Sequence, residues 1–325
     1  KFDLDLNFNN FISSNLSTKI ERVSGDSYLN IFNSYITKSD VKPKDLNKLN
    51  SNVKIYLDHQ DYNFESGVEV YETLNKKNSD RYQYILPYYN FDKLFSENYY
   101  NGYINFSSSG SNDLNNTNDL KTSIINDLVY NSESFISNKG FKTEYSLNFK
   151  NINSVGKKNN KYKSTPQVEL ISLLNASLSL PMIKNSDYYT NLLTPKISLR
   201  INPSDMINYS DSKNKVDVGN IFLTNRLGLT DTFEAGRSLT LGLDFKREEN
   251  NIDAINKYFE FKLATVLRDK EEAFISSKST LNRKTSNLFG SFTSKLSEKI
   301  DIGYNFSIDN DYNTIEYNDI NATFS

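Results

Sequence analysis

Polar and apolar residues alternate strictly in many segments along this chain. In SLTLGLDFK (238–246), leucine and phenylalanine occupy every second position, and threonine, glycine, aspartate and lysine fill the positions between them. A period of two is typical of antiparallel strands with one apolar and one polar face. The same period recurs in six further segments: 2–9, 53–58, 68–71, 141–149, 259–263 and 302–308. Helical periodicity is nearly absent, and only 44–49 and 203–207 suit a turn of helix.

Clusters of turn-forming residues separate the alternating segments and set the expected strand count. They lie at 75–80, 107–113, 137–140 and 156–161. The spacing predicts roughly fourteen to sixteen strands of about 10 residues, whereas soluble sandwiches use strands of about 5–6 residues. Closure into a barrel removes the edges of such a sheet. We therefore predict an all-β chain that forms a large antiparallel transmembrane β-barrel, here as an incomplete, open fragment.

The composition agrees with a wall that has one apolar and one wet face. Only 37% of the 325 residues are hydrophobic, yet 22 are tyrosine and 21 are phenylalanine, which suits aromatic girdles at two membrane interfaces. The 38 basic and 40 acidic residues leave a net charge of −2, so bulk charge gives no support for a nucleic-acid partner. No run of eighteen apolar residues exists, which excludes a transmembrane helix within the sequence.

The chain opens on KFDLDLNFNNF, already in strand rhythm, with no initiator methionine and no signal peptide. We expect residues 1–325 to be a single β-barrel domain fragment of a longer protein, with targeting elements outside it.

Residues that could carry catalysis are scarce. His59 is the only histidine and cysteine is missing, so thiolate metal sites, disulfides and cysteine nucleophiles are excluded within this stretch. No metalloprotease, phosphate-loop, dinucleotide or calcium-loop motif occurs. We therefore expect a protein that is not an enzyme, without a cofactor or a metal site.

One segment is dense in charge and glycine. Arg226, Asp231, Glu234 and Arg237 lie within twelve residues, around Gly228 and Gly236. In a barrel lumen such charges can pair and fix a loop, because a buried charge needs a partner. The alternative is an exposed turn with charges chosen for solubility, and local physics modestly favours that alternative.

Proline and glycine mark expected turns, bulges or strand starts, because proline cannot donate to a strand ladder. Five residues are assigned to this group: Pro87, Pro195, Pro203, Gly228 and Gly236. We predict a long irregular connection at about 181–195, a strand at 196–201 and a second connection to about residue 218.

Several ordered stretches resemble one family. LTPKISLRINP (193–203) and the segment 220–242 resemble a pattern whose matching positions are Leu193, Pro195, Leu199, Arg200, Pro203, Asn220, Phe222, Asn225, Arg226, Gly228, Asp231, Glu234, Gly236 and Gly242. Leu229 and Thr230 separate Gly228 from Asp231, which is a variant form of the turn. IERVSGDSYLNIF (20–32), with Arg22, Ser24, Asp26, Tyr28 and Leu29, resembles a strand segment of the same family, and YQYILPYYNF (82–91), FKNIN (149–153) and SLP (179–181) follow in the expected order. Together these stretches resemble the barrel domain of the lipopolysaccharide-assembly outer-membrane protein family (LptD), over about residues 20–250.

The resemblance implies a function without covalent chemistry. Members insert lipopolysaccharide into the outer leaflet of the outer membrane of Gram-negative bacteria. They receive it from periplasmic bridge proteins, hold a plug lipoprotein of the LptE type inside the barrel, and contact membrane lipid. It also implies a luminal or loop polar network formed by Arg200, Arg226, Asp231, Glu234 and Arg237. Lateral-gate residues and disulfide cysteines of the family are expected outside this fragment.

Two other classes remain open from the sequence. A general porin or receptor barrel would need a constricting loop with clustered charges. A surface adhesin built from β-sandwiches would need shorter strands with their apolar faces turned inward.

Overall fold

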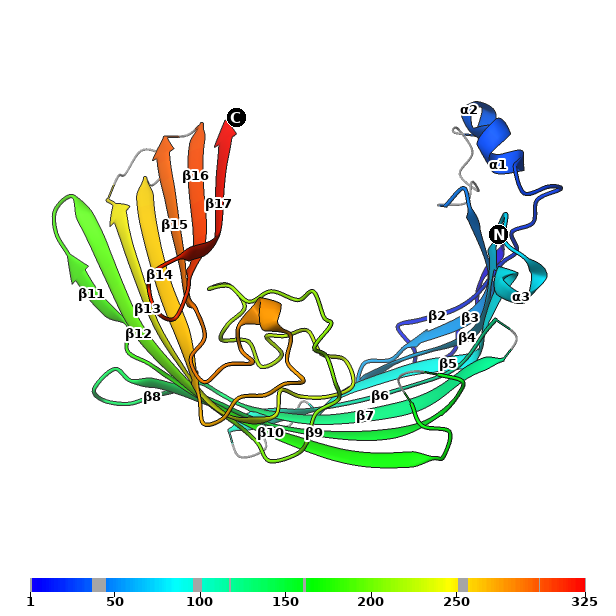
Figure 1. The fold of residues 1–325 in the computed structure, drawn as a ribbon, viewed down its shortest axis with the longest axis horizontal. Helices are drawn as coiled ribbons and strands as arrows, with labels where there is room; N and C mark the ends of the chain where they lie inside the picture. Colours follow the sequence, from blue (N-terminus) through cyan, green and yellow to red (C-terminus); the bar gives the residue numbers. More distant parts are fainter. Residues whose placement is uncertain are drawn as a thin grey trace. The chain divides into compact units, whose positions relative to one another are not determined.

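The computed structural model describes residues 2–36, 45–95, 101–116, 118–159, 162–250, 257–297 and 299–324, and Figure 1 shows the chain. These residues are almost entirely antiparallel β-sheet, as the alternation predicts. The strands are β1 Phe2–Asp5, β2 Ser13–Lys19, β3 Lys48–Asp58, β4 Tyr62–Thr73, β5 Tyr82–Phe95, β6 Gly102–Asn115, β7 Asp119–Ser132, β8 Phe135–Ile136, β9 Lys142–Lys157, β10 Gln167–Ser179, β11 Met182–Asn185, β12 Tyr189–Asn202, β13 Gly236–Glu249, β14 Tyr258–Arg268, β15 Leu288–Ser297, β16 Ile300–Ile308 and β17 Ile315–Phe324. In the described residues, helix is limited to α1 Tyr28–Ile31, α2 Asn33–Ile36, α3 Asn78–Arg81 and the 3₁₀ turn η1 Ser277–Ser279.

The described strands belong to one 17-stranded sheet. Long strands that follow one another in the chain pair with each other, as in β2–β3–β4–β5–β6 and β12–β13–β14–β15–β16–β17. Three strands, β1, β8 and β11, have four residues or fewer, and the other fourteen have at least seven. The sequence-based count therefore matches the long strands and misses the short ones.

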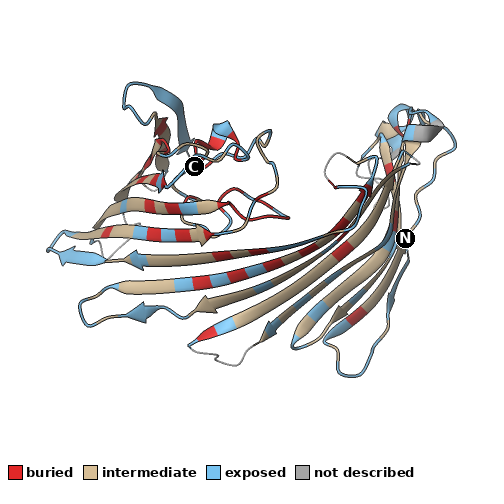
Figure 2. Ribbon diagram, turned by 60° about the horizontal axis from the view of Figure 1, so that its bottom comes forward, coloured by how far each residue is buried: buried red, intermediate tan, exposed pale blue. Residues whose placement is uncertain are grey.

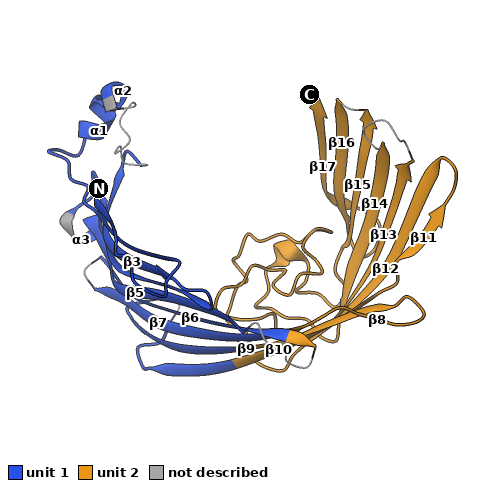
Figure 3. Cartoon of the chain, turned by 180° about the vertical axis from the view of Figure 1, so that it is seen from behind, with its two compact units in different colours: residues 1–99, 103–129, 150–170 blue, residues 100–102, 130–149, 171–325 orange. Residues whose placement is uncertain are grey.

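The chain divides into two compact units, coloured separately in Figure 3. Unit 1 comprises residues 1–99, 103–129 and 150–170, and unit 2 comprises 100–102, 130–149 and 171–325. Strands β6, β7, β9 and β10 contribute residues to both units.

Unit 1 carries a polar network on one face of β3–β5. Lys54 forms an ion pair with Glu69, Tyr71 donates its hydroxyl to Glu69 at 2.5 Å, and Tyr88 donates to Glu65 at 2.7 Å. Because each charged side chain has a partner on the same or the neighbouring strand, the face is polar without leaving these charges isolated.

The connection between β2 and β3 is fixed by one arginine. The Nη2 atom of Arg81 lies 2.7 Å from Asp26 and 2.6 Å from Glu72. Residues 20–32 were expected to include a strand, but this segment follows the end of β2 and contains the short helix α1. Asp26 bonds to an arginine side chain and to the backbone N–H of Asn75, which holds the segment as a loop.

Unit 2 has two long connections, 203–235 after β12 and 269–287 after β14, which lie together beside the ends of these strands (Figure 1). They share one hydrophobic cluster with the sheet, composed of Met206, Val216, Ile221, Leu227, Leu229, Ala235, Ala264, Val266, Ile275, Leu281 and Phe289. Most of these side chains come from the connections and only three from strands β14 and β15. The connections therefore form a packed layer on one face of the sheet, held by ordinary apolar burial.

Burial in β12 is reversed relative to a soluble protein. Ile197 and Leu199 are 43% and 41% exposed, whereas Ser198 and Arg200 are 2% and 4% exposed. The buried and exposed bands that alternate along long strands in Figure 2 follow the same period of two. A β-sandwich buries the apolar face of its sheets, so this arrangement contradicts the adhesin alternative.

Three local expectations from the sequence are wrong. Residues 203–207 are irregular and not helical, and Lys48 and Leu49 begin β3 (Lys44 lies outside the described residues). The serine-rich segment 107–113 is the middle of β6, where a Cβ on Gly110 would lie 2.5 Å from the ring of Tyr89. The glycine of this segment therefore makes room for a ring of the neighbouring strand and does not mark a turn.

The predicted irregular connection at 181–195 is instead a hairpin. β11 pairs with β12 from Met182↔Leu193, and β10 pairs with β12 from Ser179↔Lys196. Pro195 falls between these two registers. Its carbonyl accepts a bond from the N–H of Leu180 at 3.1 Å, and the return bond to Leu180 is missing because proline has no N–H. The second connection ends at Ala235 and not at about 218.

Candidate functional site

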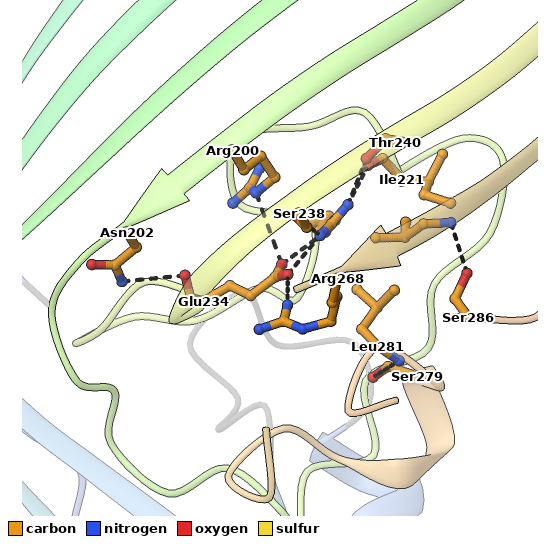
Figure 4. Close-up of polar contacts among 12 residues, drawn as sticks. Arg200, Asn202, Ile221, Glu234, Ser238, Thr240, Arg268, Ser279, Leu281 and Ser286 are labelled. Carbon is orange, nitrogen blue, oxygen red and sulfur yellow. Dashed lines mark hydrogen bonds and ion pairs between the residues drawn. The ribbon is translucent and has the colours of Figure 1, made fainter. Parts of the chain in front are cut away.

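A buried carboxylate, that of Glu234, lies at the end of connection 203–235 in unit 2. Arg226 donates from Nε to Oε2 at 2.7 Å and from Nη2 to Oε1 at 2.6 Å. Arg268, the last residue of β14, donates to the same Oε1. Arg200 of β12 lies 3.9 Å away as a third cation (Figure 4). The four side chains are at most 5% exposed, and we call them the arginine–glutamate cluster.

The arginines also bind the backbone of the connection. Arg200 donates to the carbonyls of Leu223, at 3.0 Å, and of Thr224, and Arg268 donates to the carbonyl of Ala235. These bonds satisfy carbonyl groups that a folded-in loop cannot pair within a strand ladder. The cluster therefore attaches 203–235 to β12 and β14 at several points.

Arg226 connects the two parts from the other side, because it belongs to the connection and binds the sheet. It lies in the connection and donates to Ser238 at 3.0 Å and to Thr240 at 2.9 Å, both on β13. The Asn202 side chain adds bonds to the carbonyls of Phe233 and Glu234 at 3.3 and 3.2 Å. Since both ends of the connection and its middle are tied to the same strands, the layer has one defined position on unit 2.

The charges in the cluster set the pKa of Glu234. Burial by itself would raise this pKa, but Arg226, Arg200 and Arg268 outweigh it and bring it to about 2. The carboxylate is therefore ionised at neutral pH and offsets one of three positive charges.

The turn before the cluster is fixed by its own side chains. Asn225 accepts from the N–H of Leu229 at 2.8 Å and donates to its carbonyl at 2.7 Å. Gly228 between them has φ +62°, a conformation that glycine adopts without strain. Asp231 is buried and accepts a bond from the hydroxyl of Tyr209.

An aromatic ring lies directly on the strand beside this turn. A Cβ on Gly242 would lie 2.5 Å from the ring of Phe222, so the glycine makes room for that ring on β13. The ammonium group of Lys196 also lies over the ring of Phe222, with Nζ 5.7 Å from the ring centroid. Phe222 packs against the hydrophobic cluster described above.

The structure brings together part of the predicted polar network. Arg200, Arg226 and Glu234 are joined, whereas Asp231 is buried nearby with a different partner. Arg237 is exposed, and its contact with the cluster region is a backbone N–H bond to Asp269 at 3.4 Å. It shares the parity of Leu239 in β13, so strand alternation turns its side chain away from the cluster.

The expected turn and bulge residues fall at different kinds of position. Pro87 lies at a register shift between Ile85 and Tyr88, which is a bulge in β5. Pro203 directly follows β12, and Gly236 starts β13 with φ +84°. Pro195 is neither turn nor bulge, since it lies inside β12 opposite Leu243.

Sequence reasoning missed Arg268, which lies 34 residues after Glu234. The register pairs Ser238 with Arg268, and this pairing brings the guanidinium to the cluster. No local pattern contains that information, although Arg268 stands on the same parity as the buried Val266 and Ala264.

Among the described residues no set of three or more histidine, cysteine, aspartate or glutamate side chains could hold a metal ion. No helix in the described part of the chain is long and apolar enough to cross a membrane.

The sequence matches no model of a known protein family, and no curated protein is similar enough to be a relative.

Proposed function

We propose that this chain forms part of the wall of a β-barrel in the outer membrane of a Gram-negative bacterium. The observation that carries the proposal is the reversed burial of β12, with apolar Ile197 and Leu199 outward and polar Ser198 and Arg200 covered. An apolar outer face of long strands is what contact with lipid requires. The same alternation in β9 exposes Leu147 while Ser146 and Asn148 are buried.

Within this class, we propose that the protein inserts lipopolysaccharide into the outer leaflet. The support is the resemblance of 193–242 to the LPS-assembly family, together with the structural use of its residues. Asn225 and Gly228 form the turn, Arg226 and Glu234 form the cluster, and Gly242 accommodates an aromatic ring. The matching positions therefore belong to one folded unit, as expected when a motif preserves a structure.

The polar face of unit 2 is covered, since Ser238 and Thr240 bind Arg226 of the overlying connection. A loop with clustered charges is also what the porin alternative requires, so the support for lipopolysaccharide insertion is the resemblance, and co-purification separates the two functions. We propose that the layer formed by 203–235 and 269–287 shapes the interior to which a plug lipoprotein of the LptE type binds. Lipopolysaccharide and the periplasmic bridge proteins are the other proposed partners.

Co-purification tests this function. The intact parent protein is extracted from native outer membranes in mild detergent, and bound lipid and protein are identified by mass spectrometry. A stoichiometric lipoprotein together with lipopolysaccharide supports the proposal. A homotrimer with neither, conducting ions in a planar bilayer, overturns it in favour of a porin.

A substitution connects the test to the structure. Arg226→Ala removes the bonds that hold the connection to Glu234 and β13. We expect the variant to insert into the membrane but to lose the co-purifying lipoprotein. Arg237→Ala is the matched control, because it removes the same kind of side chain from an exposed neighbouring position. An unchanged amount of lipoprotein with Arg226→Ala would contradict the proposed role of the layer.

A further inference from the structure

A second feature lies at the other end of the same strands, away from the two long connections. A hollow of about 340 Å³ opens where β12 and β14 begin and β13 and β15 end. Its lining includes Tyr189, Arg247, Lys257 and Phe259. The arginine–glutamate cluster contributes no residue to it.

The strand register shows which face this hollow occupies. Arg247 pairs with Phe259 and shares the parity of Leu243 and Phe245 on β13. The hollow therefore lies on the apolar face, which turns from leucine and phenylalanine to charge at Arg247. The ring of Phe259 lies 5.7 Å from that of Phe245, tilted against it, and 6.3 Å from that of Phe292, stacked on it (distances between ring centroids).

The guanidinium group of Arg247 is positioned to bind an anion. Its guanidinium carbon lies 4.0 Å from the ring centroid of Tyr189, so one flat face is covered by the ring. Its Nε is buried and has no hydrogen-bond partner in the described part of the chain. A stacked guanidinium keeps its in-plane N–H groups available, and their fork matches a phosphate or carboxylate.

The described residues that line the hollow carry more positive than negative charge. Three of them are basic, Arg247, Lys257 and Lys295, and one, Glu249, is acidic. Below the charged rim the same face continues as Phe245 and Leu243. A ligand that satisfies both parts has an anionic head and an apolar body.

We propose that this hollow binds the phosphate head group of a glycerophospholipid. Arg247 and Lys257 are its cationic ligands, and Tyr189 and Phe259 pack against the adjoining glycerol and acyl carbons. The proposal rests on the proposed function in one respect, that this face lies in lipid. The long connections of outer-membrane barrels are extracellular and the short turns periplasmic, so the lipid belongs to the periplasmic leaflet.

Native mass spectrometry of the full-length protein in detergent tests the site, with phosphatidylglycerol, phosphatidylcholine and inorganic phosphate as probes. We expect a stoichiometric phosphatidylglycerol adduct, lost by about tenfold or more in Arg247→Gln/Lys257→Gln because charge-assisted bonds are removed. Lys246→Gln is the matched control, since Lys246 is the adjacent residue on the opposite face and pairs with Glu248. We expect it to retain the adduct.

Several outcomes would overturn the site. They are equal retention of all lipids by every variant, equal loss in Lys246→Gln, or displacement of the lipid by inorganic phosphate, which would indicate a free-anion site. If the double variant does not fold, Lys257→Gln is tested alone, because Lys257 is exposed; an unchanged adduct would then also overturn the assignment.

An independent probe separates this inference from the proposed function. The 325 residues contain no tryptophan, so Leu243→Trp introduces a reporter on the apolar face of this stretch. Quenching by brominated phosphatidylcholine without head-group selectivity would overturn the site and leave the membrane proposal intact. Absence of quenching would overturn both.

Discussion

Neutralising Glu234 tests whether one carboxylate holds the inner layer of unit 2 in place. In Glu234→Gln the shape is kept, but three buried guanidinium groups lose their counter-charge. Removing one partner of a buried ion pair costs about 3–5 kcal/mol, because the remaining charge is left uncompensated. The pKa of Glu234 gives a second figure. This pKa lies at about 2 instead of 4.5. Each tenfold change in proton affinity corresponds to about 1.4 kcal/mol, so the lowered pKa corresponds to a stabilisation of about 3 kcal/mol by the ionised carboxylate.

Hydrogen exchange of the backbone amides in 221–235 is the direct assay, because the free energy that is lost is the one that keeps the connection folded against the sheet. A loss of about 3 kcal/mol accelerates exchange more than a hundredfold where the exchange rate follows the opening equilibrium. Arg237→Gln, which changes an exposed charge two residues after the connection, is expected to alter stability by less than about 0.5 kcal/mol. If both variants exchange at the same rate, the cluster does not fix the layer, and the reasoning fails.

The same group predicts the direction of a pH effect. The pKa of Glu234 is lowered by folding, so its contribution is complete above about 4.5, declines as the pH falls toward about 2, and is lost below that value. We expect the protection of the 221–235 amides, measured as their exchange rate relative to an unstructured amide at the same pH, to fall through this window in the wild type. Glu234→Gln should show no such fall from this group, and an identical pH profile of protection in both proteins would contradict the assignment.

Three further substitutions probe the layer and the outer face, each by urea unfolding of the reconstituted protein. Gly242→Ala places a Cβ 2.5 Å from the ring of Phe222 and should destabilise by about 1–3 kcal/mol; a neutral result would mean that the ring moves freely. Tyr209→Phe removes the hydroxyl that binds buried Asp231, with an expected loss of about 1–3 kcal/mol, and wild-type stability would exclude a structural role for that bond. Leu241→Lys should cost about 2–4 kcal/mol in lipid if the position faces the middle of the bilayer, and an unchanged folding yield would contradict that orientation.

The strands could be predicted because alternation is a local property that the sheet preserves. The segment 238–246 forms β13 as expected, and its leucines occupy one face. The hairpin β11–β12 could not be predicted, because Pro195 is tolerated inside β12 at the point where the pairing passes from β10 to β11. That tolerance is a property of three strands together and leaves no mark in the local sequence.

The site was predictable to the extent that its charges lie close in sequence. Arg226 and Glu234 are eight residues apart and do pair. Arg268 comes from another strand, and its position depends on a register that no short segment specifies. The position of Arg237 outside the arginine–glutamate cluster could have been predicted. The alternation that turns Leu239 outward also turns outward the residue two positions earlier, which is Arg237.

The layer over β12–β14 makes the connection and the strands inseparable in engineering and in evolution. Replacing 203–235 by a short turn, a change that many barrel loops tolerate, would remove Arg226 and Glu234 and leave Arg200 and Arg268 uncovered on the sheet. A shortened version would also need smaller or neutral residues at both strand positions. We therefore expect homologues to change these four positions together, so that a pattern of joint substitution between a loop and two strands would identify proteins that keep this inner layer.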